Sequence, residues 1–77
     1  MDAALREALA AELQVEPDEL TSERALASFE LWDSATVLSV MVVLGDAVGR
    51  PVLPHEMAAL KTVADIEAMV RSKTAEK

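Results

Sequence analysis

The sequence contains no cysteine and no tyrosine, and Phe29 and Trp32 are its only large aromatic residues. Without cysteine the chain has no disulfide, no thiolate nucleophile and no thiolate metal ligand, so any thiol chemistry must come from a cofactor. Two Gly and three Pro among 77 residues are too few for a turn-rich β-sandwich, and the 52% apolar content argues against disorder. We therefore expect one compact all-α domain.

Positive charge is also scarce, because seven Lys and Arg residues face fourteen Asp and Glu residues, for a net charge of −7. Such a chain repels nucleic acid phosphates and anionic lipids, which argues against nucleic acid or membrane partners and favours basic proteins. Residues 1–33 hold nine acids and two bases, whereas residues 34–77 hold five of each. The whole net charge therefore lies before Ser34.

Long apolar runs are missing as well. The richest stretch, residues 37–44, is interrupted by Ser39 and is far too short to span a bilayer. Near the start of the chain, Asp2, Glu7 and Glu12 interrupt any apolar segment of the kind found in signal peptides. We expect a cytoplasmic monomer, and the lack of cysteine is compatible with that compartment.

A first helix is predicted over residues 3–13, followed by a long loop over residues 14–33. Asp2 is a favourable N-cap, and an apolar stripe recurs every four residues at Leu5, Leu9 and Leu13. Pro17 cannot continue a helix but can open a short turn. Apolar anchors are spaced along the loop, so we expect it to be ordered against the core. These anchors are Val15, Leu20, Leu26, Phe29 and Leu31.

The second helix is predicted over residues 34–48, with Asp33 or Ser34 as its N-cap. Gly49 suits the left-handed residue that ends a helix, and Pro51 prevents its continuation. Only a thin polar line of Thr36, Ser39 and Asp46 interrupts its apolar side chains. We therefore expect this helix to be central, with other helices around most of it.

Two further helices are predicted in the last third of the chain. Pro54 is suited to the first turn of a short helix over residues 55–60. Thr62 and Asp65 have the spacing of a capping box at the start of a last helix over residues 63–71. The polar residues 72–77 are expected to fray.

This order of parts resembles the acyl carrier protein family over nearly the whole chain. The family signature Asp-Ser-Leu is read here as Asp33-Ser34-Ala35 at the start of an apolar helix, and the last helix begins with the family-like Thr-Val-x-Asp-Ile. The resemblance implies a four-helix bundle, with three main helices, a short third helix and a long loop between helices 1 and 2. It also implies a carrier with no catalytic residue and no resident metal.

In that family a phosphopantetheinyl transferase uses coenzyme A and Mg²⁺ to attach 4′-phosphopantetheine to the serine, and the thiol of this arm carries acyl groups as thioesters. By resemblance Ser34 is the attachment residue, and Asp33 belongs to the motif that the transferase recognises. Further partners implied are a loading ligase or acyltransferase and condensing or tailoring enzymes. A phosphodiester at Ser34 would lie at the positive end of the helix dipole.

The chain departs from the usual family pattern around Ser34. Ala35 replaces the common Leu, and Trp32 stands where fatty-acid carriers often have small residues, which is more similar to stand-alone carriers of polyketide, antibiotic or related specialised biosynthesis. The expected second helix has few carboxylates, so we expect partners to recognise the acidic loop by charge and that helix mainly by shape. Candidate partner contacts are Glu30, Trp32, Ala35, Ser39, Val43 and Asp46.

Three alternatives stay open. An aminoacyl or peptidyl carrier is the nearest, although the glycines that usually precede the serine in such carriers are absent here. A degenerate carrier acting as an acidic adaptor without cofactor is the second, and Ala35 gives it some support. An enzyme is the third, but His55 has no second His, Cys or Ser in a recognisable catalytic arrangement.

Overall fold

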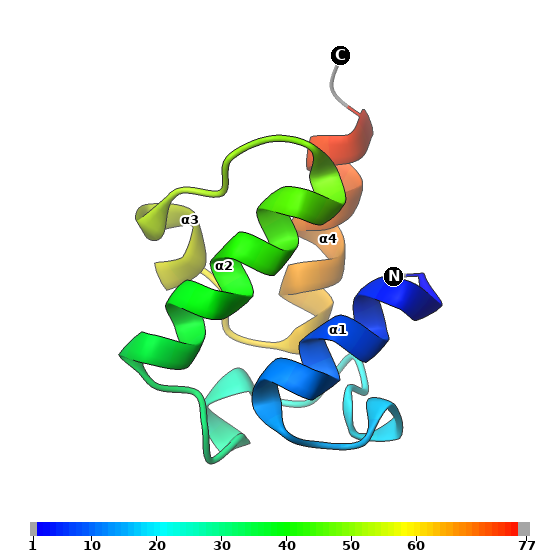
Figure 1. Cartoon of the computed structure of the whole chain (residues 1–77), viewed down its shortest axis with the longest axis vertical. Coiled ribbons are helices and arrows are strands. Elements are labelled where there is room, and N and C mark those ends of the chain that lie inside the picture. Colours follow the sequence, from blue (N-terminus) through cyan, green and yellow to red (C-terminus); the bar gives the residue numbers. More distant parts are fainter. Residues whose placement is uncertain (1, 76–77) are drawn as a thin grey trace.

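A computed structural model describes residues 2–75 and shows an all-α protein (Figure 1). Two single-turn 3₁₀ helices, Pro17–Glu19 and Leu26–Ser28, interrupt the long loop. The only extended pairing within residues 2–75 is an isolated bridge between Ala25 and Thr62. The helices of this part of the chain are α1 (Ala3–Leu13), α2 (Ser34–Val48), α3 (Pro54–Ala58) and α4 (Val63–Ala75).

Helix α1 has the predicted bounds and the predicted buried stripe. The Asp2 carboxylate accepts a hydrogen bond from the Leu5 N–H at 2.8 Å and so caps the helix. The helix ends at Gln14, whose φ of 55° is in the left-handed region. Its buried side chains are Leu5, Leu9, Ala10 and Leu13.

The long loop is ordered against the core, as its apolar anchors predict. Leu20, Leu26 and Phe29 are buried, and Val15 packs against them at the edge of the core. The Leu26 N–H donates to the Lys61 carbonyl at 2.9 Å, which joins the loop to the segment before α4. These contacts hold the chain immediately before α2 in place.

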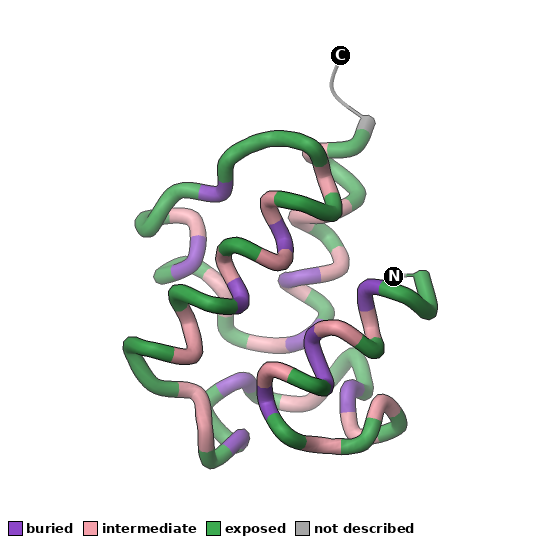
Figure 2. Tube along the Cα trace, in the orientation of Figure 1, coloured by how far each residue is buried: buried purple, intermediate pink, exposed green. Residues whose placement is uncertain are grey.

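Helix α2 also has the predicted bounds, and Gly49 ends it with a φ of 71°. It crosses the middle of the view in Figure 1 and contacts α1, α3 and α4. Only Val40 and Leu44 on it are buried, whereas Leu38 and Val42 are 56% and 62% exposed. Figure 2 shows that exposed and half-buried positions make up most of α2. The expectation of a helix covered on most sides is therefore wrong. These three neighbours cover only part of α2, because a chain this short provides little further surface to pack on it.

Helix α3 differs slightly from the prediction of residues 55–60, because it spans Pro54–Ala58. Pro54 itself is the first helical residue, where its missing N–H costs nothing. Helix α3 then ends as the Ala59 N–H bonds to the Glu56 and Met57 carbonyls. Met57 is its buried residue and anchors it to the core.

Helix α4 begins at Val63 as predicted but is longer than residues 63–71, since it continues to Ala75. Thr62 and Asp65 form the expected reciprocal cap, with the Asp65 N–H donating to the Thr62 hydroxyl and the Thr62 N–H to the Asp65 carboxylate. The fraying expected from residue 72 is not seen up to residue 75, and residues 76–77 lie outside the described part. The Lys73 ammonium lies 2.8 Å from the Glu56 carboxylate, and this contact ties the last turns of α4 to α3.

Candidate functional site

Ser34 is the first residue of α2 and is exposed to solvent. It follows a tight connection, because the Trp32 N–H donates to the Phe29 carbonyl and the Asp33 N–H donates to the Leu31 carbonyl at 2.8 Å. Phe29 is buried, so this connection is fixed to the core. The hydroxyl of Ser34 is thus presented at a helix N-terminus by an ordered segment.

Asp33 is the N-cap of α2. Its Oδ1 accepts from the Thr36 N–H at 3.0 Å, and its carbonyl accepts from the Val37 N–H at 2.8 Å. Two first-turn amides of α2 are therefore already bonded to Asp33. The helix dipole and the amides of residues 34 and 35 would stabilise an anion on Ser34. The nearby Asp33 carboxylate would repel it.

Trp32 packs partly against the core and lines an apolar hollow of about 400 Å³ between α2 and α3. Lys61 is the only charged residue among those that line it. Packing against the core explains why an aromatic residue stands before α2. Trp32 is only half-buried, so part of it stays accessible to solvent. The remaining lining residues are Leu26, Ala27, Val37, Leu38, Met41, Pro54, Met57, Ala58 and Leu60.

One face of α2 runs from Ser34 toward Gly49 and is open to solvent. Its exposed residues follow the three- and four-residue spacing that places side chains on one face of a helix. From Ala35 to Asp46 this face is about 17 Å long at 1.5 Å per residue. Its members are Ala35, Leu38, Ser39, Val42 and Asp46, all classed as exposed, and we refer to them as the α2 face.

Val43, a predicted partner contact, is less exposed than that prediction implies. It is half-buried against the core and lines a further hollow together with Leu5 and Ala8 of α1. Leu38 and Val42 are the large apolar residues exposed on the α2 face, and sequence analysis did not single out Leu38. Val42 and Leu38 lie four and eight residues before the polar residue Asp46. This spacing places all three on one face of a helix and could have identified Val42 and Leu38 as exposed.

Glu30 is exposed in the loop, beside a second hollow that Arg24 and Phe29 also line. The Arg24 guanidinium lies 4.1 Å from the centre of the Phe29 ring and 3.4 Å from the Glu19 carboxylate. The carboxylate of Glu19 is thus paired with a basic residue of the same loop. Glu30 is in no ion pair within residues 2–75, so its charge is available on the surface.

No known protein family matches the chain, and no curated protein matches its sequence.

Among residues 2–75, no group of three His, Cys, Asp or Glu residues lies close enough together to hold a metal ion. His55 is exposed on α3. Within the same residues, no helix combines the length and the hydrophobicity needed to cross a bilayer.

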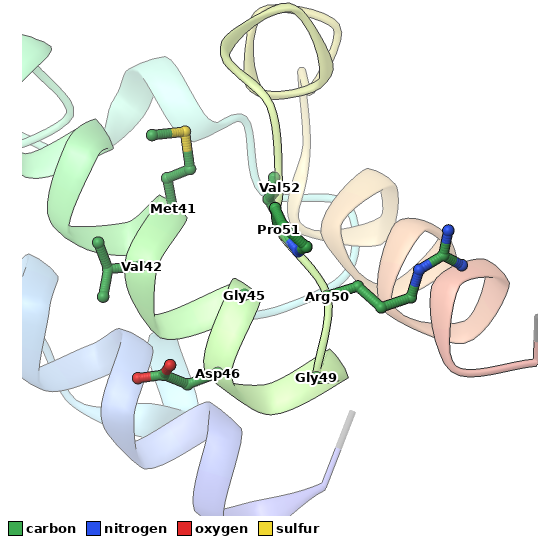
Figure 3. A pocket seen from close by; sticks show the side chains of 8 residues that line it. All are labelled: Met41, Val42, Gly45, Asp46, Gly49, Arg50, Pro51 and Val52. Carbon is green, nitrogen blue, oxygen red and sulfur yellow. The ribbon is translucent and has the colours of Figure 1, made fainter.

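Another hollow, of about 530 Å³, lies at the other end of α2 from Ser34 (Figure 3). The chain passes closely over α2 there, since a methyl group on Gly45 would lie 3.4 Å from the Arg50 carbonyl oxygen. In Figure 3 the side chains of Asp46 and Arg50 point in opposite directions, so Asp46 alone gives this end of the α2 face its charge.

Among residues 2–75, the carboxylates of Glu56 and Asp65 have a lowered pKa, and both belong to the α3–α4 region. The Lys73 ammonium, helped by the Leu53 N–H, holds the pKa of Glu56 below its ordinary value. The backbone N–H groups of Lys61 and Thr62 do the same for the pKa of Asp65. Both groups stabilise local structure, and neither lies beside Ser34.

Proposed function

We propose that this protein is an acyl carrier protein that holds acyl intermediates as thioesters on a 4′-phosphopantetheine arm at Ser34. The observation that carries the proposal is the position of Ser34, whose exposed hydroxyl stands at the first residue of α2 behind the Asp33 cap. The helix order, with a long ordered loop before α2 and a short third helix after it, supports an acyl-carrier-type four-helix bundle. The proposed role needs recognition by partners and no catalytic group of its own.

Two features beside Ser34 suit this role. The apolar hollow between α2 and α3 can shelter a hydrophobic cargo, because its lining is almost wholly uncharged. The α2 face offers apolar contacts at Leu38 and Val42 together with one carboxylate, Asp46. A flexible arm at one end of this face raises the effective concentration of cargo at any enzyme that docks there.

The partners in this proposal are a phosphopantetheinyl transferase, a loading ligase or acyltransferase, and condensing or tailoring enzymes. We place the carrier in the cytoplasm, as a monomer, in polyketide or related specialised biosynthesis. Charge favours partners with basic surfaces, since the chain carries a net charge of −7. An aminoacyl or peptidyl cargo fits the same chemistry, because the arm forms a thioester with either kind of acid.

A cofactor-free adaptor is the second candidate, and Ala35 favours it. Ala35 is exposed directly beside Ser34 and supplies little apolar surface for an enzyme that modifies Ser34. Such an adaptor would use the α2 face without any covalent change. It predicts that Ser34 stays unmodified under every condition.

Incubation with coenzyme A, Mg²⁺ and a broad-specificity phosphopantetheinyl transferase distinguishes the two candidates. The carrier gains the mass of one phosphopantetheine, and Ser34→Ala abolishes the gain. Ser39→Ala is the matched control, because Ser39 is an exposed serine on the same helix. A protein that gains no mass, or a gain that survives Ser34→Ala, contradicts the carrier proposal.

A further inference from the structure

Helix α3 forms the outer wall of the hollow between α2 and α3, and little holds it there. It has five residues, too few to be stable without tertiary contacts. On its inner side Met57 is buried, and Val52, just before the helix, is buried as well. In Figure 1 it lies at the edge of the molecule, between an extended connection from α2 and a short connection to α4.

Glu56 connects this wall to α4. One carboxylate oxygen of Glu56 accepts from the Leu53 N–H at 2.9 Å, which closes the first turn of α3. The other oxygen lies 2.8 Å from the Lys73 ammonium. The same carboxylate therefore both caps α3 and binds it to the last turns of α4.

This ion pair is the single polar contact between residues 51–60 and any other helix within residues 2–75. The backbone hydrogen bonds of α3, such as those of Met57 and Leu60, stay within the segment itself. The Lys73 side chain is only 12% exposed, so solvent ions screen the pair less than a fully exposed one. The lowered pKa of Glu56 agrees with a pair that is formed at neutral pH.

We infer that the Glu56–Lys73 ion pair is a latch that holds α3 closed over the apolar hollow. When the pair is broken, Met57 and Val52 remain as the anchors of α3, and the segment opens more often. Opening exposes the hollow on the side of α3 and leaves the contact between α1 and α2 intact. The latch is a property of the fold and does not depend on what Ser34 carries.

The latch has a consequence for the carrier role, and this consequence rests on the proposed function. An acyl chain attached at Ser34 would enter or leave the hollow past Trp32 and α3, which line it. A partner that draws Lys73 or Glu56 into its own ion pairs would release α3. Docking on α3 or α4 would then favour delivery of the cargo.

Amide hydrogen exchange on the unmodified protein tests the latch directly. In Lys73→Gln the amides of Met57 and Leu60 should exchange about two- to fivefold faster, the range set by ion pairs near protein surfaces. Arg71→Gln is the matched control, because it removes the same charge from α4 one half-turn earlier and Arg71 is exposed. It should leave both amides unchanged.

Glu56→Gln gives a second route to the same result, since the Gln carbonyl can still accept from the Leu53 N–H. The double variant Glu56→Gln with Lys73→Gln should match the single variants, because all three remove one interaction. Quenching of Trp32 fluorescence by acrylamide should rise in each of them.

Equal exchange in Lys73→Gln and Arg71→Gln, or an acceleration as large at Leu9 in α1 as at Met57, would overturn the latch. Failure of Ser34 to accept phosphopantetheine would leave it standing.

Discussion

The Asp33 carboxylate accepts a hydrogen bond from the Thr36 N–H at 3.0 Å, so the residue before Ser34 has a structural role in α2. Under the proposed carrier function, Asp33 would also belong to the motif that the modifying enzyme recognises. Substitutions can separate these two roles, because capping needs an acceptor oxygen and does not need a negative charge.

Asp33→Ala should therefore lower the free energy of unfolding by about 1 kcal/mol, while Asp33→Asn should stay close to the parent protein. Urea unfolding measures both. If the Asp33 charge serves the transferase as well, Asp33→Asn will be stable but slow to accept phosphopantetheine. Equal destabilisation by Ala and Asn would show that the negative charge of Asp33 at the start of α2, and not an acceptor oxygen alone, provides the stabilisation.

The two sides of α2 should respond differently to the same substitution. Leu44 is fully buried, and Leu44→Ala should cost about 2–5 kcal/mol. Leu38 is 56% exposed, and Leu38→Ala should cost under about 1 kcal/mol. A Leu38→Ala protein as unstable as Leu44→Ala would show that the α2 face is covered in solution.

The α2 face should matter for partners. Val42→Ser should slow transfer of the acyl group to or from a partner enzyme, because Val42 is the most exposed large apolar side chain on this face. The stability of the folded chain should change little. Rates of transfer measured with purified partner enzymes test this, and unchanged rates would exclude contact at Val42.

The acidic loop should be recognised by charge. Glu30→Lys should slow loading of Ser34 at low salt, and added salt should reduce the difference from the parent protein. Glu7→Lys makes the same charge change at an exposed position of α1 and serves as the control. Loading rates that fall equally in both variants would point to net charge alone.

Stability should fall in acid through Glu56 and Asp65. Both have a pKa below the ordinary values of 4.5 and 3.8, so their stabilising effect is full at neutral pH. It is lost progressively as the pH falls below those values and through the lowered folded pKa. The groups that face them are Lys73 and His55 for Glu56, and Lys61 for Asp65.

Urea midpoints between pH 7 and pH 3 measure this loss. The double variant Glu56→Gln with Asp65→Asn should show a smaller decrease over the interval than the parent protein. A decrease of the same size would assign acid sensitivity to other carboxylates.

Local signals predicted the boundaries of α1 and α2 well, because they depend on residues next to the boundary. Asp2 and Asp33 cap the helix starts, and Gly49 takes the left-handed conformation that ends α2. The extra length of α4 was missed for a different reason. Residues 72–74 are polar, and Lys73 bonds to Glu56, seventeen positions away in the sequence.

The exposed side of α2 could not be predicted from the composition of the sequence. Its apolar composition predicted cover on most sides, but composition does not tell how many helices are present to provide that cover. Val43 was expected to be a partner contact between Ser39 and Asp46, whereas the structure leaves it half-buried against the core. The position of Ser34 at the start of α2 did follow from its neighbours alone.

Mass mapping of the protein after incubation with coenzyme A, Mg²⁺ and a phosphopantetheinyl transferase tests the central claim most directly. The account predicts one phosphopantetheine per chain, on the fragment that contains Ser34, with a free thiol that can then be acylated. An unmodified chain under conditions that fully modify a known carrier, or a phosphopantetheine on any other serine, would contradict it.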